Sequence, residues 1–230
     1  MMQLDTFAEQ GWQIVAGGYP AALLDALQGE LGQYTLQAHQ GGVRDLEQHP
    51  LILQLVRHPC TQVLLQTMLS DQARLVRALY FDKSSENNWQ VSWHQDKTVM
   101  LAAHIEMPGW GPWRPRDHCW HVQAPQSILT RMLTLRLHLD DADTDNGCLQ
   151  VHSGSHLWGL LSQAETSARL AQLSPLPCPA KRGDLMLMRP LLLHRSSKSH
   201  SPRPRRAVHL EFCDAPLPAP LRWAALPEPC

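Results

Sequence analysis

From Arg74 onward the sequence consists of short segments typical of β-strands, separated by stretches rich in turn-forming residues. Long helical segments do not alternate with these strands, and no internal repeat of roughly 20 to 50 residues is visible. The pattern argues against a Rossmann-type parallel sheet and favours a β-sandwich or barrel. The predicted strands contain the segments RLVRALYF, WQVSWHQD, MLTLRLHLD, CLQVHSG, DLMLMRP and RAVHLEF.

The part of the chain before these strands has a helical pattern. Four leucines at three- and four-residue spacing form one apolar stripe, which is typical of an amphipathic helix. Pro50 and Pro59 each precede an apolar run, as proline does in a first helical turn. A further short helix is predicted between two of the later strands. The predicted helices cover residues 20–32, 51–56, 61–69 and 162–172.

The composition excludes several classes of partner and site. Lys and Arg (20) nearly balance Asp and Glu (21), so the net charge of −1 gives no electrostatic footprint for nucleic acid or an anionic membrane. The six cysteines are widely separated and form no C-x-x-C pair, which argues against a zinc ribbon, a redox dithiol or a disulfide framework. Scattered reduced thiols, together with the lack of a signal peptide or an apolar span, lead us to expect a cytoplasmic protein.

One segment, residues 105–126, is rich in proline and tryptophan and is too long for a simple connection. Loops of that kind are usually lids or binding loops. Trp110 and Trp113 offer apolar surface to a bound molecule. We therefore expect this segment to be an irregular substrate lid.

A candidate metal site begins with His94 and Asp96, which occupy alternate positions of a predicted strand. Both side chains should project from one face toward a common point. His194 lies near the end of another predicted strand, 100 residues after His94, and a sandwich or barrel can bring it to the same point. Two imidazoles and one carboxylate leave adjacent coordination positions open, as iron(II) oxygenases require. In a chain with 13 histidines, the H-x-D pair alone carries little weight.

Five motifs in a fixed order strengthen the case for a metal site. They are W-H-Q-D at 93–96, D-N-G-C-L-x-V-x-x-G-S-H at 145–156, G-D-L-M at 183–186, H-R-S at 194–196 and R-R-A-V-H at 205–209. In this order and spacing the sequence resembles the phytanoyl-CoA dioxygenase family of iron(II)- and 2-oxoglutarate-dependent oxygenases, mainly between Tyr80 and Phe212. The resemblance implies a double-stranded β-helix, or jelly roll, with the metal near one open end.

Carried over residue by residue, the resemblance implies that His94, Asp96 and His194 are the iron ligands. The family places an arginine eleven residues after the second ligand histidine, where it pairs with the distal carboxylate of 2-oxoglutarate. That position is Arg205 here. Ser196 matches a hydroxyl position that assists the carboxylate. The sequence departs from the family at Ser153, where many members have proline, and we expect that change to be structural only.

The strand after Arg205 offers a second argument for its role. Alternation sends Arg205, Ala207 and His209 to one face of the strand, and Arg206 and Val208 to the other. One arginine should therefore point inward, where a planar guanidinium suits a buried carboxylate. We favour Arg205 over Arg206 as this anchor.

Other polar residues fit the same pocket less directly. Arg136 and His138 alternate with leucines on a predicted strand, and in a barrel that binds a charged ligand the polar face of such a strand can be the inner one. We assign Arg136 to the cosubstrate together with Arg205. Structural loop roles compete with binding roles for Lys83 and Trp89, which precede the metal strand. The candidate substrate-binding residues are Lys83, Trp89, His138, Trp110 and Trp113.

We therefore expect one domain over residues 1–230: a mainly helical part at 1–72, an all-β jelly-roll core at 73–213 with helical decoration, and a Pro-rich tail at 214–230 that lies extended across the surface. The expected activity is hydroxylation of a C–H bond in a small molecule by dioxygen, with iron(II) as cofactor, 2-oxoglutarate as cosubstrate, and release of succinate and carbon dioxide.

Two alternatives stay open: a non-catalytic jelly-roll protein that binds or senses metal and 2-oxoglutarate, and a zinc-dependent hydrolase, which would leave Arg205 unexplained. No obligate protein partner is evident, and no cluster of Lys and Arg for the phosphates of coenzyme A is obvious.

Overall fold

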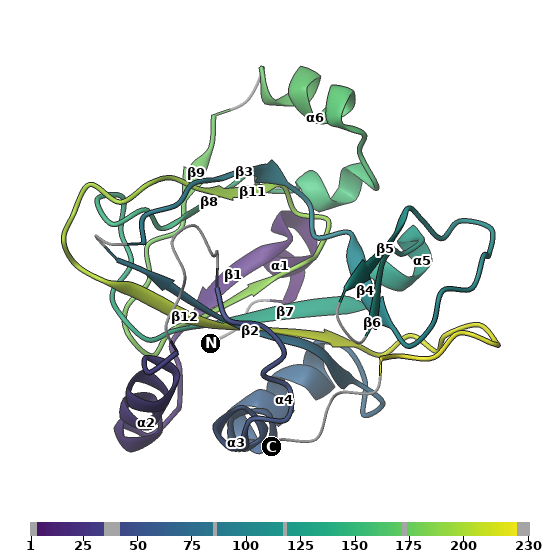
Figure 1. The fold of residues 1–230 in the computed structure, drawn as a ribbon. Helices are drawn as coiled ribbons and strands as arrows, with labels where there is room; N and C mark the ends of the chain where they lie inside the picture. The colour runs from purple at the N-terminus through teal and green to yellow at the C-terminus, as the bar shows by residue number, and fades with distance from the viewer. Residues whose placement is uncertain (1–3, 35–41, 85–86, 117–118, 172–173, 225–230) are drawn as a thin grey trace.

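The computed structural model describes residues 4–34, 42–84, 87–116, 119–171 and 174–224. Two antiparallel sheets face one another, and a smaller third sheet lies at one end of them (Figure 1). The main sheet has five strands in the order β1-β10-β7-β12-β2, and the facing sheet has four in the order β3-β11-β8-β9. The predicted fold class, an all-β jelly-roll core with helical decoration, is confirmed.

Most strands of the three sheets are short. The long ones are β7, β12 and β2, which are neighbours in the main sheet. The main sheet comprises β1 (Trp12–Val15), β10 (Leu185–Met188), β7 (Met132–His138), β12 (Arg205–Cys213) and β2 (Arg74–Lys83). The facing sheet comprises β3 (Val91–His94), β11 (His194–Ser196), β8 (Leu149–Val151) and β9 (Leu176–Pro177). The third sheet comprises β4 (Thr98–Leu101), β6 (Cys119–Gln123) and β5 (Trp113–Arg116).

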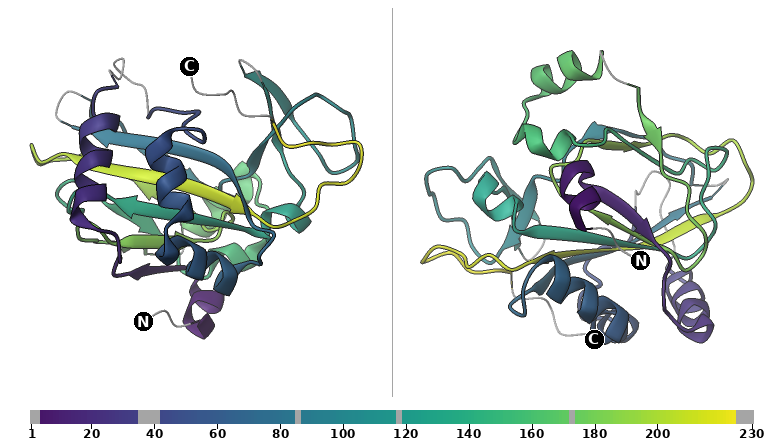
Figure 2. Two further views of the ribbon diagram at one scale, coloured as in Figure 1. Left: turned by 90° about the horizontal axis from the view of Figure 1, so that it is seen from below. Right: turned by 180° about the vertical axis from the view of Figure 1, so that it is seen from behind.

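Three helices cover the outer face of the main sheet, as the view from below shows (Figure 2). They are α2 (Ala21–Leu31), α3 (Pro50–Arg57) and α4 (Pro59–Met68), close to the predicted ranges. The Nδ1 atoms of the N-cap residues His49 and His58 accept hydrogen bonds from the backbone N–H groups of Leu51 and Cys60, both at 3.3 Å. The remaining helices are α1 (Leu4–Gln10), α5 (Gln126–Leu129), the 3-10 helix η1 (Ser155–Trp158) and α6 (Gln163–Leu170), of which the sequence predicts α6.

The main sheet sends alternate residues to its two faces. On β7 and in the residue after it, four leucines pack under the helices, whereas the side chains between them turn toward the facing sheet. Burial on both faces explains why the whole strand is buried, polar residues included. The helix-side residues of the two central strands are Leu133, Leu135, Leu137 and Leu139, and Val208, Leu210 and Phe212.

The expectation of a loop over the whole of 105–126 is wrong: residues 113–116 and 119–123 form strands, whereas 105–112 form neither helix nor strand. The role of this segment as a substrate lid stays a prediction. The segment supplies β5 and β6. Strand β6 lies in the middle of the third sheet and pairs with β5 on one side and with β4 on the other. Trp110 is only 8% exposed and packs in an apolar cluster with Val122 and Ile128. Prolines generally favour a loop, but β5 is an edge strand, and such a strand tolerates Pro115 although proline has no backbone N–H to donate. Residues 117–118 lie outside the described part.

The Pro-rich tail beyond β12 makes specific contacts with β4. The backbone N–H of Ala102 donates to the carbonyl of Arg222 at 3.0 Å, and that of Ala224 donates to Met100 at 3.1 Å. Leu221 is buried in the cluster that also holds Trp110. The tail is therefore packed through its described part, and residues 225–230 lie outside it. No described helix combines the length and the apolar character that a membrane crossing needs.

We predict that Leu135→Ala lowers the free energy of unfolding by about 2–5 kcal/mol, because it opens a cavity in the middle strand of the main sheet. Leu135 is 1% exposed and lies between the sheet and the helices. Leu157→Ala is the matched control: Leu157 is 69% exposed, and the change should stay within about 0.5 kcal/mol. Urea unfolding followed by circular dichroism measures both. Equal losses in the two variants would show that this face of the sheet is not the main core.

Candidate functional site

The three predicted metal ligands come together between the two sheets. His94 ends β3 and pairs in register with His194 at the start of β11, which closes the gap of 100 residues between them. Their ring centroids are 4.1 Å apart. Asp96 lies just past the end of β3, and its backbone N–H donates to the carbonyl of Pro190 at 2.8 Å. Strand β3 is therefore shorter than the sequence suggested, yet the carboxylate still reaches the two imidazoles.

Hydrogen bonds turn both imidazoles the same way. Nδ1 of His94 lies 2.9 Å from the carbonyl oxygen of Ser92, and Nδ1 of His194 lies 2.9 Å from that of Leu192. With the proton on Nδ1 donated to these carbonyls, each Nε2 keeps its lone pair. The Nε2 atoms lie 3.6 and 3.7 Å from the two carboxylate oxygens of Asp96. The three ligand atoms converge within 4.8 Å of one another, a separation that one metal ion can bridge.

The protonation of the cluster also suits a metal. Burial, together with the neighbouring His94, lowers the pKa of His194 to about 4, so this imidazole is neutral at pH 7. Burial opposes ionisation of Asp96, but the two imidazoles bring the pKa of its carboxyl below the usual value. Within the described part of the chain, Oδ2 of Asp96 is buried and accepts no hydrogen bond. A buried carboxylate oxygen without a donor, beside two imidazoles whose Nε2 atoms face it, fits a divalent cation such as iron(II).

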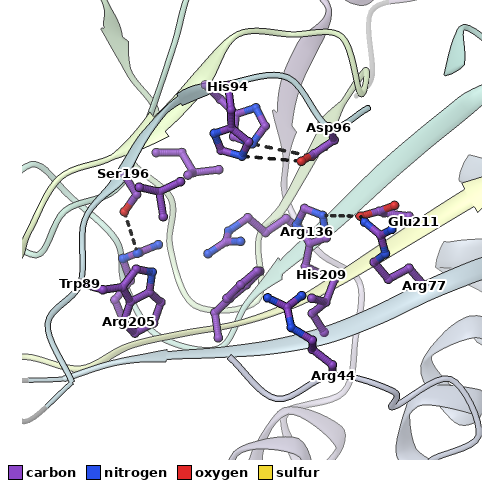
Figure 3. Close-up of a pocket in the computed structure, with 15 residues that line it drawn as sticks. Arg44, Arg77, Trp89, His94, Asp96, Arg136, Ser196, Arg205, His209 and Glu211 are labelled. Carbon is purple, nitrogen blue, oxygen red and sulfur yellow. Dashed lines mark hydrogen bonds and ion pairs between the residues drawn. The ribbon is translucent and has the colours of Figure 1, made fainter. Parts of the chain in front are cut away.

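The cluster opens on a cavity of about 300 Å³ between the sheets (Figure 3). Strand β12 supplies three polar side chains to it, and Figure 3 shows them spread along one wall. Their spacing of two residues is the alternation predicted for this strand. The three residues are Arg205, His209 and Glu211.

Two of these residues were not assigned a role from the sequence. His209 and Glu211 form a second group of possible ligand atoms with Asp96, and Nε2 of His209 lies 3.5 Å from Oε1 of Glu211. Glu211 also accepts a hydrogen bond from Arg77 at 3.1 Å. Continuing the alternation from Arg205 would have found Glu211, whereas Arg77 depends on the pairing of β12 with β2, which the sequence does not reveal.

Arg205 is 2% exposed and lies beside a serine hydroxyl. One of its terminal nitrogens donates to Oγ of Ser196 at 3.0 Å. Its Nε and NH1 atoms have no hydrogen-bond partner among the described residues. Burial lowers the pKa of Arg205 to about 10, which still leaves it charged at pH 7. The guanidinium therefore presents unused donors inside the molecule, and leaving such donors unpaired is costly.

Two more cations surround Arg205. The guanidinium of Arg136 lies 4.9 Å from the centre of the Phe81 ring and lines the same cavity. Nζ of Lys83 donates to Oγ of Ser196 at 2.9 Å and to the carbonyl of Ser197 at 2.5 Å. Burial, reinforced by the two arginines, lowers the pKa of Lys83 to about 7. Burial, reinforced by Arg205, lowers that of Arg136 to about 9.

The other candidate substrate-binding residues are dispersed. Trp89 lines the cavity, with Nζ of Lys83 5.3 Å from its ring. His138 is 1% exposed on the inner face of β7, but it is not among the side chains that line the cavity. Burial and the charges of Arg136 and Arg205 lower the pKa of His138 to about 3. Trp110 and Trp113 lie in the apolar cluster of the third sheet, away from this cavity, because that cluster buries their rings.

The family model described as Phytanoyl-CoA dioxygenase (PhyH) matches residues 7–207. The chain belongs to this family. Among curated proteins it is 25% identical over 190 residues to phytanoyl-CoA dioxygenase domain-containing protein 1 of Mus musculus. That match covers 76% of the chain and 57% of the mouse protein, so the chain spans little more than half the length of this relative.

Solved structures share the fold at low identity. The crystal structure of EvdMO1 aligns with a TM-score of 0.69 and 18% identity over 92% of this chain and 49% of that chain. HygX from Streptomyces hygroscopicus was solved with nickel, 2-oxoglutarate and hygromycin B bound. It aligns with a TM-score of 0.66 and 13% identity, over 92% of this chain and 86% of the HygX chain. At these identities the likeness shows the fold alone.

We predict that His94→Ala, Asp96→Ala and His194→Ala each weaken iron(II) binding by more than about tenfold, since even the loss of a ligand's outer partner has that effect. The variants should stay folded, because the apolar cores lie outside the cluster. His104→Ala is the control, since His104 pairs with Glu106 at 2.7 Å, outside the cluster. Anaerobic metal titration and thermal melting measure both properties. A variant that keeps full iron affinity would remove its residue from the ligand set.

Proposed function

We propose that this protein is an iron(II)- and 2-oxoglutarate-dependent dioxygenase that hydroxylates a C–H bond of a small-molecule metabolite. The observation that supports it most is the presence, in one cavity, of a His-Asp-His cluster and a buried arginine with unused donors. The cluster suits the metal end of 2-oxoglutarate, and the arginine suits its other end. A zinc hydrolase would need the cluster but not Arg205.

His94, Asp96 and His194 would hold the iron. Bound there, iron(II) would supply the activation of dioxygen that couples decarboxylation of 2-oxoglutarate, to succinate and carbon dioxide, with oxidation of a C–H bond. The proton positions described above keep both Nε2 atoms free to ligate.

Arg205 and Ser196 would receive the distal carboxylate of 2-oxoglutarate. The fixed Ser196–Arg205 hydrogen bond orients the guanidinium, whose Nε and NH1 remain for the ligand. A planar guanidinium binds a carboxylate through two parallel hydrogen bonds, which sets direction as well as affinity. Arg136 and Lys83 add positive charge to the same end of the cavity and favour a dianion over a neutral molecule.

Succinate formation by the iron-loaded protein tests the reaction. A panel of metabolites is added under air with 2-oxoglutarate, and succinate is measured with and without each compound. Stimulation by at least one compound, together with a product that has gained an oxygen atom, supports the proposal. Binding of iron and 2-oxoglutarate without any stimulated turnover would favour a binding or sensing protein instead.

The anchor is tested by Arg205→Ala, which leaves the distal carboxylate of 2-oxoglutarate buried and unpaired. A loss of this kind is on the order of 2–5 kcal/mol, so affinity for 2-oxoglutarate should fall by roughly 30-fold to several thousand-fold. Iron binding should change little. Calorimetry of the metal-loaded protein under argon measures both.

Arg206→Ala is the matched control on the same strand. Arg206 points to the other side of β12 and pairs with Asp140 at 2.7 Å, so the affinity for 2-oxoglutarate should change by less than about fivefold. A larger effect of Arg206→Ala than of Arg205→Ala would contradict the anchor. If neither variant changes the affinity, 2-oxoglutarate is not bound in this way.

A further inference from the structure

A second group of basic residues lies across the cavity from Arg205. In Figure 3, Arg205 and Ser196 lie at one side of the cavity, whereas Arg44 and Arg77 lie at the opposite side, near Glu211. The sequence showed no such cluster, because its members are distant along the chain. It is assembled from the segment before α3, from β2, and from the third sheet, and it consists of Arg44, Arg77, Arg114, Arg116 and His121.

Members of this group line two spaces that meet at the metal cluster: Arg44 and Arg77 line the inner cavity, and the other three residues line an outer hollow. His94 and Asp96 line the inner cavity, and they also line the outer hollow of about 990 Å³. Arg114 and Arg116 are exposed on β5, two residues apart, so both belong to one face of that strand, and both line the outer hollow. A molecule in this hollow would therefore lie against the arginines at one end and near the metal ligands at the other.

Among the described residues, carboxylates pair with only part of this group. Arg77 already uses donors within the protein: it donates to Oε1 of Glu211 at 3.1 Å and to the carbonyl of Thr98 at 2.9 Å. Glu211 in turn is shared with His209. Within the described part of the chain, no ion pair or side-chain hydrogen bond joins Arg44, Arg114 or Arg116 to a partner.

The arginines of this group also act on one another. Burial, followed by the charges of Arg116 and Arg77, lowers the pKa of Arg44, although Asp45 and Glu211 act in the opposite direction. Burial and the same arginines lower the pKa of His121 to about 4, so this imidazole is neutral at pH 7 and adds no charge. An anion between Arg44 and Arg116 would relieve the repulsion between them.

We propose that the substrate carries an anionic group, a carboxylate or a phosphoryl group, which Arg44 and Arg116 bind at the entrance while the oxidised C–H bond lies near the metal. The inference rests on the proposed function in one respect: 2-oxoglutarate already uses the metal and Arg205 for its two carboxylates, so the entrance group is left for the substrate. Planar guanidinium groups on separate elements suit the several oxygens of such an anion.

The test uses small aromatic probes and calorimetry. Phenyl phosphate and benzoate are the anionic probes, and benzamide is the uncharged match of benzoate. Each is titrated into the protein saturated with iron(II) and 2-oxoglutarate under argon, and into the metal-free protein. At least one anion should bind in both forms, more weakly as salt is raised, whereas benzamide should not. The tighter of the two anions identifies the acid class.

Charge-matched variants locate the binding site. Arg44→Gln and Arg116→Gln should each weaken anion binding by roughly tenfold, the effect of losing one hydrogen bond to a charged group. Arg57→Gln, an exposed position on α3 that lines neither space, should change it by less than about twofold. A metabolite that stimulates succinate formation should show the same dependence on Arg44 and Arg116 in its KM.

Several outcomes would overturn the inference. Equal binding of benzoate and benzamide would remove the need for an anion. If the anion binds only when the metal is present, and neither Arg44→Gln nor Arg116→Gln weakens it, the probe binds to the iron. A loss of 2-oxoglutarate affinity in Arg44→Gln as large as the loss of anion affinity would assign Arg44 to the cosubstrate. Failure of iron or 2-oxoglutarate to bind would instead defeat the proposed function, and arginine-dependent binding of the anion to the metal-free protein would still support the entrance site.

Discussion

Burial of the outer face of the main sheet under α2, α3 and α4 holds the polar inner face in place. On β12, Val208 and Leu210 pack toward the helices, while Arg205 and His209 turn into the cavity. A slip of one residue in the pairing of β12 would exchange these two sets, placing guanidinium groups under the helices and apolar residues in the cavity. The apolar contacts on one face therefore fix the position of the charged groups on the other.

The charges of the inner face are only partly balanced. Arg77 and Glu211 form an ion pair near Asp96, with His209 beside Glu211, so the burial of each of these two charges is offset by its partner. Arg136 and Arg205 have no carboxylate at hydrogen-bonding distance within the described residues. Taking a guanidinium out of water without a counter-charge is unfavourable, so this end of the cavity stabilises the molecule least and attracts an anion most.

Much of the metal site could be predicted because it depends on local order. His94 and Asp96 are two residues apart, and the alternation of residues along the strand that begins at Arg205 is enough to favour this arginine over Arg206. The short β-type segments favoured a sandwich or barrel, the leucine stripe predicted α2, and the resemblance to the family implied a jelly roll. These features depend on residues that are close together in the sequence, and such local patterns can be read from periodicity and spacing.

The parts that failed depend on contacts between distant segments. Proline and tryptophan in 105–126 suggested a loop, but pairing with β6 made a strand of Trp113–Arg116, and an apolar cluster buried Trp110. Arg44 belongs to a segment with no motif, and only the fold brings it to the cavity that Arg77 also lines. Propensity is a weak guide where tertiary packing decides, and here packing decided both the third sheet and the entrance.

The protonation of Lys83 affects both the stability of the fold and the binding of an anion. Its pKa of about 7 lies below the 10.5 of an ordinary lysine, so the folded chain holds this proton more weakly than the unfolded chain does. Between those two pH values the unfolded state binds more protons, and this residue makes the folded state more stable as pH rises. A carboxylate received by Arg205 and Ser196 acts in the opposite direction, because it favours the ammonium form of the neighbouring lysine. Burial favours loss of the Lys83 proton, whereas a bound anion favours its retention. The protonated Lys83 is therefore unfavourable for folding and favourable for binding an anion.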